Sequence, residues 1–94
     1  MSQTTRTPVA SDAETSLMAL LSACRRRGLK AEPDPAITGG VVVSHHSRVV
    51  TLRLMAHRWY RPAPDQTGTA VNMGARGAED VIARHLTDEL MGYL

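Results

Sequence analysis

The chain has 94 residues, of which 43% are hydrophobic and 21% are charged, and its formal net charge is +2. This length leaves room for one hydrophobic core, so it excludes a two-domain enzyme with a cleft between lobes. The apolar runs span only a few residues, far fewer than the roughly 20 that a membrane-crossing helix needs, so we expect no membrane partner.

The first predicted helix covers about residues 12–27. Residues 1–10 are polar and lack an apolar period, so we expect a disordered N-terminal arm there, followed by a single domain over residues 11–94. Ser11 and Glu14 match a capping box, apolar residues follow at helical spacing, and Gly28 supplies a left-handed stop.

One cysteine, Cys24, falls on the apolar side of this helix. A lone cysteine cannot form an internal disulfide, and at such a position it is typical of a small buried hydrophobe. The first residues also lack the apolar stretch of a secretory signal. The sequence therefore favours a cytoplasmic location.

A β-hairpin is predicted in the middle of the chain, after a short strand at residues 30–32 that two prolines stop. Its first strand contains residues 41–44, its turn uses residues 45–46 or 46–47, and one long strand follows from residue 48 to residue 60. Both turn positions predict the same two faces, because side chains alternate with a period of two.

One face of this hairpin is apolar and predicts the surface that packs on the core. The other face mixes apolar and polar side chains, and a bulge near His57 would remove Trp59 from it and bury that side chain. The apolar face holds Val41, Val43, Val50, Leu52, Leu54 and Ala56, and the mixed face holds Val42, Ser44, Val49, Thr51, Arg53, Met55, His57 and, without a bulge, Trp59.

A loop rich in proline and glycine follows, after which residues 69–71 could return as a third strand. A second amphipathic helix then continues almost to the C-terminus. The order predicts a small α+β domain with a helix, a hairpin or three-stranded antiparallel sheet, and a second helix, both helices lying on one sheet face. The predicted buried stripe of the second helix is Ala78, Val81, Ile82, His85, Leu86, Leu90 and Tyr93.

With both helices on one side, the mixed face has nothing within one chain to cover it. This arrangement predicts a non-enzymatic protein-interaction module that self-associates as a homodimer or docks a protein partner. A monomer with scattered exposed apolar residues is the alternative. The predicted partner-binding residues are Val42, Val49, Thr51, Arg53, Met55, His57 and Trp59.

Nucleic-acid binding is the alternative function, because cations cluster at the end of the first helix and recur along the long strand. Two aromatic residues between Arg58 and Arg61 could stack on single-stranded bases. The candidate residues are Arg25, Arg26, Arg27, Lys30, Arg53, Arg58 and Arg61.

The order of elements over residues 12–92 also resembles the double-stranded-RNA-binding domain, which has a helix, three strands and a second helix. That family begins its second helix with a lysine-rich phosphate grip, whereas residues 74–80 here hold one cation, Arg76, followed by Glu79 and Asp80. The resemblance rests on topology, and no functional residue is carried over from it.

The sequence holds weaker candidates for catalytic or metal-binding groups. His45 and His46 in the hairpin turn lie too far along the strand from His57 to share an ion, and His85 fits a hydrogen-bonded residue at the core boundary. Arg76 at the entry of the second helix could assist an anion. No nucleophile with a base and an orienting acid is evident, so we expect neither an enzyme nor a metal or other cofactor.

Overall fold

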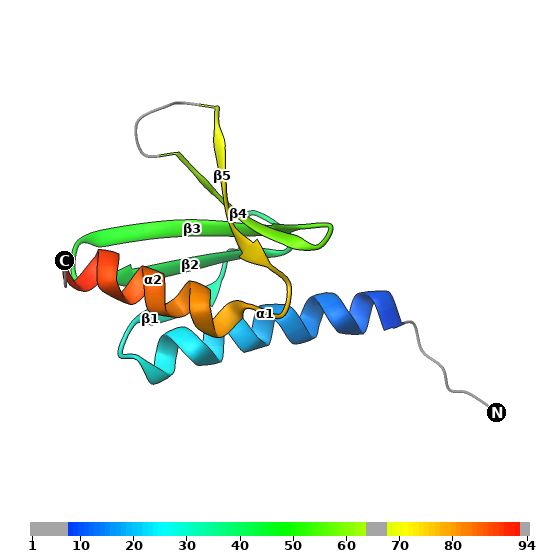
Figure 1. The fold of residues 1–94 in the computed structure, drawn as a ribbon, viewed down its shortest axis with the longest axis horizontal. Coiled ribbons are helices and arrows are strands. Elements are labelled where there is room, and N and C mark those ends of the chain that lie inside the picture. The colour runs from blue at the N-terminus through cyan, green and yellow to red at the C-terminus, as the bar shows by residue number, and fades with distance from the viewer. Residues whose placement is uncertain (1–7, 64–67, 93–94) are drawn as a thin grey trace.

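The computed structural model describes residues 8–63 and 68–92. Its elements follow in the order α1 (Pro8–Arg26), β1 (Lys30–Pro33), β2 (Gly40–His45), β3 (Arg48–Met55), β4 (Arg58–Pro62), β5 (Ala70–Ala75) and α2 (Glu79–Met91). The strands form one antiparallel sheet of five strands in sequence order, and both helices lie on the same side of it (Figure 1). The predicted α+β domain is confirmed, with two strands more than the double-stranded-RNA-binding topology.

Helix α1 begins at Pro8, before the predicted start at residue 12. Proline suits the first turn of a helix because its φ is already helical and its missing N–H is one that the helix would not use. Ser11 therefore lies inside the helix and is not its N-cap, and residues 1–7 of the expected arm lie outside the described residues. The predicted stop is confirmed: Gly28 has a φ of 90°, and the Leu29 N–H donates to the Cys24 carbonyl at 3.0 Å.

The prediction of one continuous strand over residues 48–60 is wrong, because a tight turn divides this segment into β3 and β4. Met55 pairs with Arg58, which leaves Ala56 and His57 as the two turn residues, and Ala56 has a φ of 58°. The other hairpin has His46 and Ser47 in its turn, as the pairing of His45 with Arg48 requires. The predicted short first strand is present as β1, and the third ladder partner is present as β5.

The second turn reverses the chain and decides the position of Trp59. Opposed residues of an antiparallel pair share a face, so Trp59, which pairs with Leu54, lies on the core side of the sheet. Its exposed fraction is 0%. The alternative that buries Trp59 is therefore confirmed, although a turn and not a bulge places it there, so Trp59 is absent from the open face. His57 lies in the turn instead of on a strand.

Helix α2 buries Ile82, Leu86 and Leu90 of the predicted stripe, but its buried face is rotated relative to that stripe. Val81 is 46% exposed and His85 is exposed, whereas Glu79, Ala83 and Thr87 are buried. The physical reason is that α2 packs against α1 as well as against the sheet, so small and polar residues at that contact are covered. Thr87 remains satisfied there because its hydroxyl donates to the Ala83 carbonyl at 2.7 Å.

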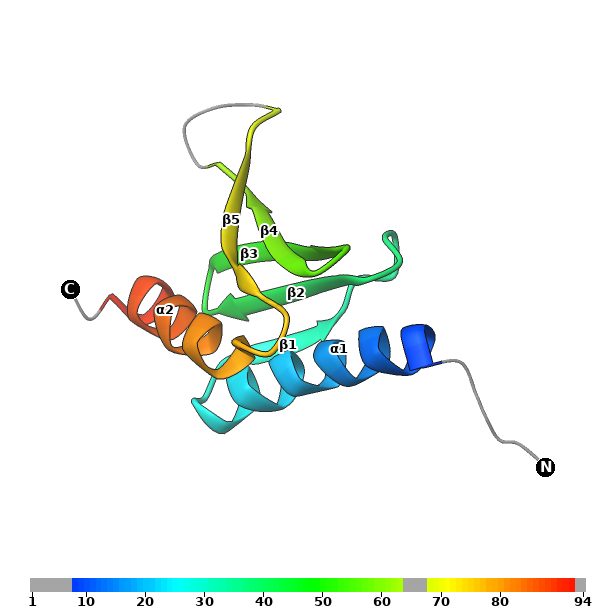
Figure 2. The same cartoon turned by 45° about the vertical axis from the view of Figure 1, so that its right-hand side comes forward.

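The sheet is strongly bent. Strands β4 and β5 rise out of it on the side away from the helices (Figures 1 and 2). The register between these strands shifts at Trp59 and Tyr60, which leaves Met73 as an extra residue in β5. Among the described residues, no helix is long and apolar enough to cross a membrane.

Candidate interaction surface

The open face is the side of the sheet turned away from α1 and α2. Cross-strand pairing places Val42 opposite Thr51 and Arg53 opposite Tyr60 on this side. Val49 is 59% exposed and Met55 is 40% exposed, so no described element covers them. The open face contains Val42, Ser44, Val49, Thr51, Arg53, Met55, Arg58 and Tyr60.

Five of the predicted partner-binding residues therefore lie together, namely Val42, Val49, Thr51, Arg53 and Met55. Sequence reasoning missed Tyr60, because one continuous strand assigns it to the opposite face. The sequence contains a signal for this turn. The alternation of apolar and polar side chains fails at Arg58, which would face the core, and at Trp59, which would face the open side. A two-residue turn explains that failure, whereas a bulge would have kept one strand.

The open face contains a groove with a volume of about 380 Å³. Strands β3 and β4 form its floor, the loop between β1 and β2 forms one rim, and the beginning of β5 forms another. Its lining is mostly apolar. The lining residues are Asp34, Ile37, Thr51, Leu52, Arg53, Met55, Tyr60, Arg61, Pro62, Gly68, Thr69 and Ala70.

Backbone hydrogen bonds hold the rim formed by the β1–β2 loop. The Ala36 N–H donates to Oδ1 of Asp34 at 2.9 Å, and the Gly40 N–H donates to the Ile37 carbonyl at 3.0 Å. The Asp34 N–H in turn donates to the Gly40 carbonyl at 2.9 Å, which closes the loop. A side chain at Gly40 would be crowded, since its Cβ would lie 3.1 Å from the Asp34 Cβ and the loop would have to shift to admit it. These contacts fix Ile37 beside the groove.

Charge is unevenly distributed around the groove. Arg53 lines it, and Arg58 lies next to Met55 on the neighbouring strand. Among the side chains that the structure describes, neither arginine has an ion-pair partner. Asp34 is the carboxylate of the lining. The groove can therefore take an apolar side chain, and its cationic edge suits an acidic neighbour.

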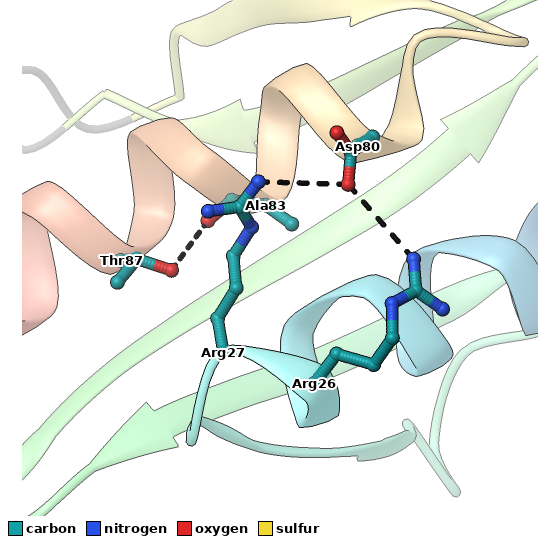
Figure 3. Close-up of polar contacts among 5 residues, drawn as sticks. All are labelled: Arg26, Arg27, Asp80, Ala83 and Thr87. Atoms are coloured by element: carbon teal, nitrogen blue, oxygen red, sulfur yellow. Dashed lines mark hydrogen bonds and ion pairs between the residues drawn. The ribbon is translucent and has the colours of Figure 1, made fainter.

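The predicted nucleic-acid surface is not one patch. Arg26 and Arg27 both point toward Asp80 of α2, at 3.9 and 3.6 Å, and so bridge the two helices (Figure 3). Nε of Arg25 donates to the Ala31 carbonyl at 2.9 Å. Lys30 lies 4.0 Å from Glu32.

The remaining three candidate cations are on strands. Arg61 is on the helix side of β4, where it pairs with Glu89 and keeps only 13% of its side chain exposed. Arg53 and Arg58 are on the open face. The structure therefore separates Arg25, Arg26 and Arg27 from Arg53 and Arg58 on the open face.

The entry of α2 is occupied by the protein's own carboxylate. Both oxygens of Glu79 accept from the Gly77 N–H at 3.1 Å, and Oε2 also accepts from Nε1 of Trp59 at 3.1 Å. The Arg76 N–H donates to the His57 carbonyl at 2.7 Å. An anion at this helix entry would have to displace Glu79 from the Gly77 amide, so the site is poorly suited to phosphate.

The histidines and the cysteine do not form a reactive cluster. The rings of His45 and His46 meet edge to face, 4.2 Å apart, while His57 lies in the turn at the other end of β3. Within the described residues, no group of three or more metal-ligating side chains occurs. Cys24 is buried, and burial raises the pKa of its thiol to about 11, partly offset by Arg27.

Comparison of this chain with protein-family models, with curated proteins and with solved structures finds no match.

Proposed function

We propose that this chain is a protein-interaction module that holds a segment of a partner protein in the groove of its open face. One observation carries the proposal: a concave, mostly apolar groove of about 380 Å³ lies on a sheet face that neither helix covers. Concave apolar surfaces with a few polar groups are the usual places where proteins bind ligands and partners.

The shape of the face favours a convex partner over face-to-face stacking of two copies. Sheets that pack face to face keep a nearly constant separation of roughly 10 Å. Strands β4 and β5 rise from the open face, so two such faces would meet at these strands and leave the groove unfilled (Figure 2). A protruding segment fills the groove without that gap.

The lining indicates the chemistry of the segment. Ile37, Met55 and Tyr60 offer contacts to an apolar anchor side chain, whose desolvation supplies most of the affinity. The guanidinium groups of Arg53 and Arg58 favour an acidic residue beside that anchor. Such charges at an interface rim act mainly on specificity and on the association rate.

The proposed role is non-enzymatic. We favour it over nucleic-acid binding because five of the seven candidate cations have partners within the chain, and because Arg53 and Arg58 lie beside an apolar groove. We keep the cytoplasmic location as part of the proposal, since the single thiol needs no oxidising compartment.

A random peptide library displayed on phage tests the proposal. We expect selection on the wild-type chain to enrich peptides with an apolar anchor next to an acidic residue. The Met55→Asp variant should bind the best of these peptides at least tenfold more weakly, because it places a carboxylate at the apolar lining. Titration of the labelled peptide, followed by fluorescence anisotropy, measures both affinities.

Met18→Asp is the matched control, because Met18 is a methionine of similar exposure, 54%, on α1. It should leave peptide affinity unchanged. The proposal is wrong if the two variants weaken binding equally, or if no peptide is enriched on the wild-type chain.

A further inference from the structure

The two edges of the sheet differ in their chemistry. Edge strand β1 contains Lys30 and Glu32 and ends at Pro33, features that discourage pairing with another strand. Edge strand β5, Ala70–Ala75, has neither charge nor proline, and its first three residues are exposed. The bulge at Met73 interrupts β5 but leaves Ala70, Val71 and Asn72 in regular pairing with β4. One edge of the sheet is thus open to a further strand.

The register shows which backbone groups of β5 face outward. The Ala63 N–H donates to the Thr69 carbonyl at 2.8 Å. Hydrogen-bonded and non-hydrogen-bonded pairs alternate along an antiparallel ladder, so Val71 bonds toward β4 while Ala70 and Asn72 direct their N–H and C=O groups away from it. Pro62 lies opposite Ala70, at a position where β4 does not need to donate to β5.

This pattern is self-complementary. We propose that β5 pairs antiparallel with β5 of a second copy, about a two-fold axis that passes beside Val71. Ala70 then lies opposite Asn72 of the second copy, and each such pair exchanges both of its N–H···O bonds. Val71, which is 37% exposed, packs on its own counterpart at the axis, and no like charges meet.

The pairing has a consequence for the grooves. Side chains of opposed residues in an antiparallel ladder point to the same face, so the open faces of both copies lie on one side of the joined sheet. Gly68, Thr69 and Ala70 line the groove, which places each groove next to the axis. A partner with two segments would gain affinity by binding both. The pairing itself does not depend on what the groove binds.

Sedimentation equilibrium over a range of concentrations tests the pairing. We expect the wild-type chain to reach twice its mass of 10.2 kDa, with little dependence on salt, because the contact contains no charge. Ala70→Pro should halve the mass, since it removes an outward N–H without removing a bond to β4. Ala70→Val is its control: it keeps the N–H and should stay dimeric.

Val71→Lys is a second variant, which brings two ammonium groups together at the axis. Their repulsion should also halve the mass. If circular dichroism shows that Ala70→Pro is unfolded, the mass of Val71→Lys tests the pairing in its place. Met55→Asp removes groove binding but should leave the mass at twice the monomer value. The two proposals therefore fail separately.

Amide hydrogen exchange gives a readout at single residues. The N–H groups of Ala70 and Asn72 should exchange more slowly as the concentration rises, whereas the Val71 N–H, already bonded to β4, should not change. A wild-type chain that is monomeric at every concentration overturns the pairing. So does a dimer that survives Val71→Lys, or one that Met55→Asp dissociates.

Discussion

At the scale of single residues, the contact between Trp59 and Glu79 joins the sheet to the beginning of α2. Trp59 is fully buried, and its indole N–H donates to a carboxylate that is itself only 6% exposed. The same carboxylate accepts from the Gly77 N–H. A negative charge also suits the first turn of a helix, where the backbone dipole is positive. Glu79 thus satisfies two donors and fixes where α2 starts.

Glu79→Ala should lower the free energy of unfolding by about 2 kcal/mol, because it leaves the donors of Trp59 and Gly77 without an acceptor. Urea titration measures this change, and the fluorescence of Trp59, the one tryptophan of the chain, reports it. Glu14→Ala, at an exposed position of α1, is the control and should change stability little. Equal losses in the two variants would contradict the role assigned to Glu79.

Cys24 should resist thiol reagents in the folded protein. Its pKa of about 11 leaves roughly one thiolate per thousand molecules at pH 8, and its side chain is inaccessible. Because burial both raises this pKa and closes the site to reagent, labelling of the folded protein should stay slow at pH 8 and become fast when urea exposes the thiol. Ser22→Cys in a Cys24→Ala background offers an exposed thiol on the same helix for comparison. Equally fast labelling of both thiols at pH 8 would show that Cys24 is accessible.

At the scale of elements, the two hairpin turns of two residues each hold a residue other than glycine at positive φ. Ala56 has a φ of 58° in the turn between β3 and β4, and His46 has a φ of 57° in the turn between β2 and β3. A side chain at such an angle crowds the neighbouring carbonyl, which costs about 1–2 kcal/mol. The hairpins therefore form in spite of their turn residues, and cross-strand contacts such as that of Leu54 with Trp59 supply the stability.

Ala56→Gly should raise the free energy of unfolding by about 1 kcal/mol, because relief of the strained φ exceeds the extra entropy of glycine in the unfolded chain. Thermal denaturation should register a higher Tm. Ala36→Gly, in an exposed loop where φ is negative, should lower stability instead. A fall in stability for both variants would mean that the turn carries no strain.

The residue pattern that predicted α2 illustrates which part of an element can be read from the sequence. Ile82, Leu86 and Leu90 are buried as the period predicts. Val81 and His85 are exposed because the contact with α1 rotates the helix toward Ala83 and Thr87. A small side chain such as Ala83 can be buried or exposed on a helix, so its identity does not predict which neighbouring element covers it.

At the scale of the whole molecule, the groove and the β5 edge are adjacent surfaces that meet at Ala70, and different variants test them. A variant that loses peptide binding but stays dimeric shows that the groove binds peptide without contributing to the dimer contact. Loss of the dimer with retained peptide binding identifies an edge whose role is to bring two grooves together. Measuring both quantities in Met55→Asp and Val71→Lys separates these roles in one set of samples.

The sequence by itself determined the helices, the first hairpin, the core side chains of β2 and β3, and most of the open face. These features follow from local periods and from Gly28 at the end of α1, which need no knowledge of distant neighbours. Only the tertiary structure decided where Trp59, Tyr60 and Arg61 point, because one turn at Ala56 and His57 reverses the chain and exchanges the faces beyond it. The groove and the exposed edge arise from the same event, since they exist only where β4 and β5 leave the plane of the sheet.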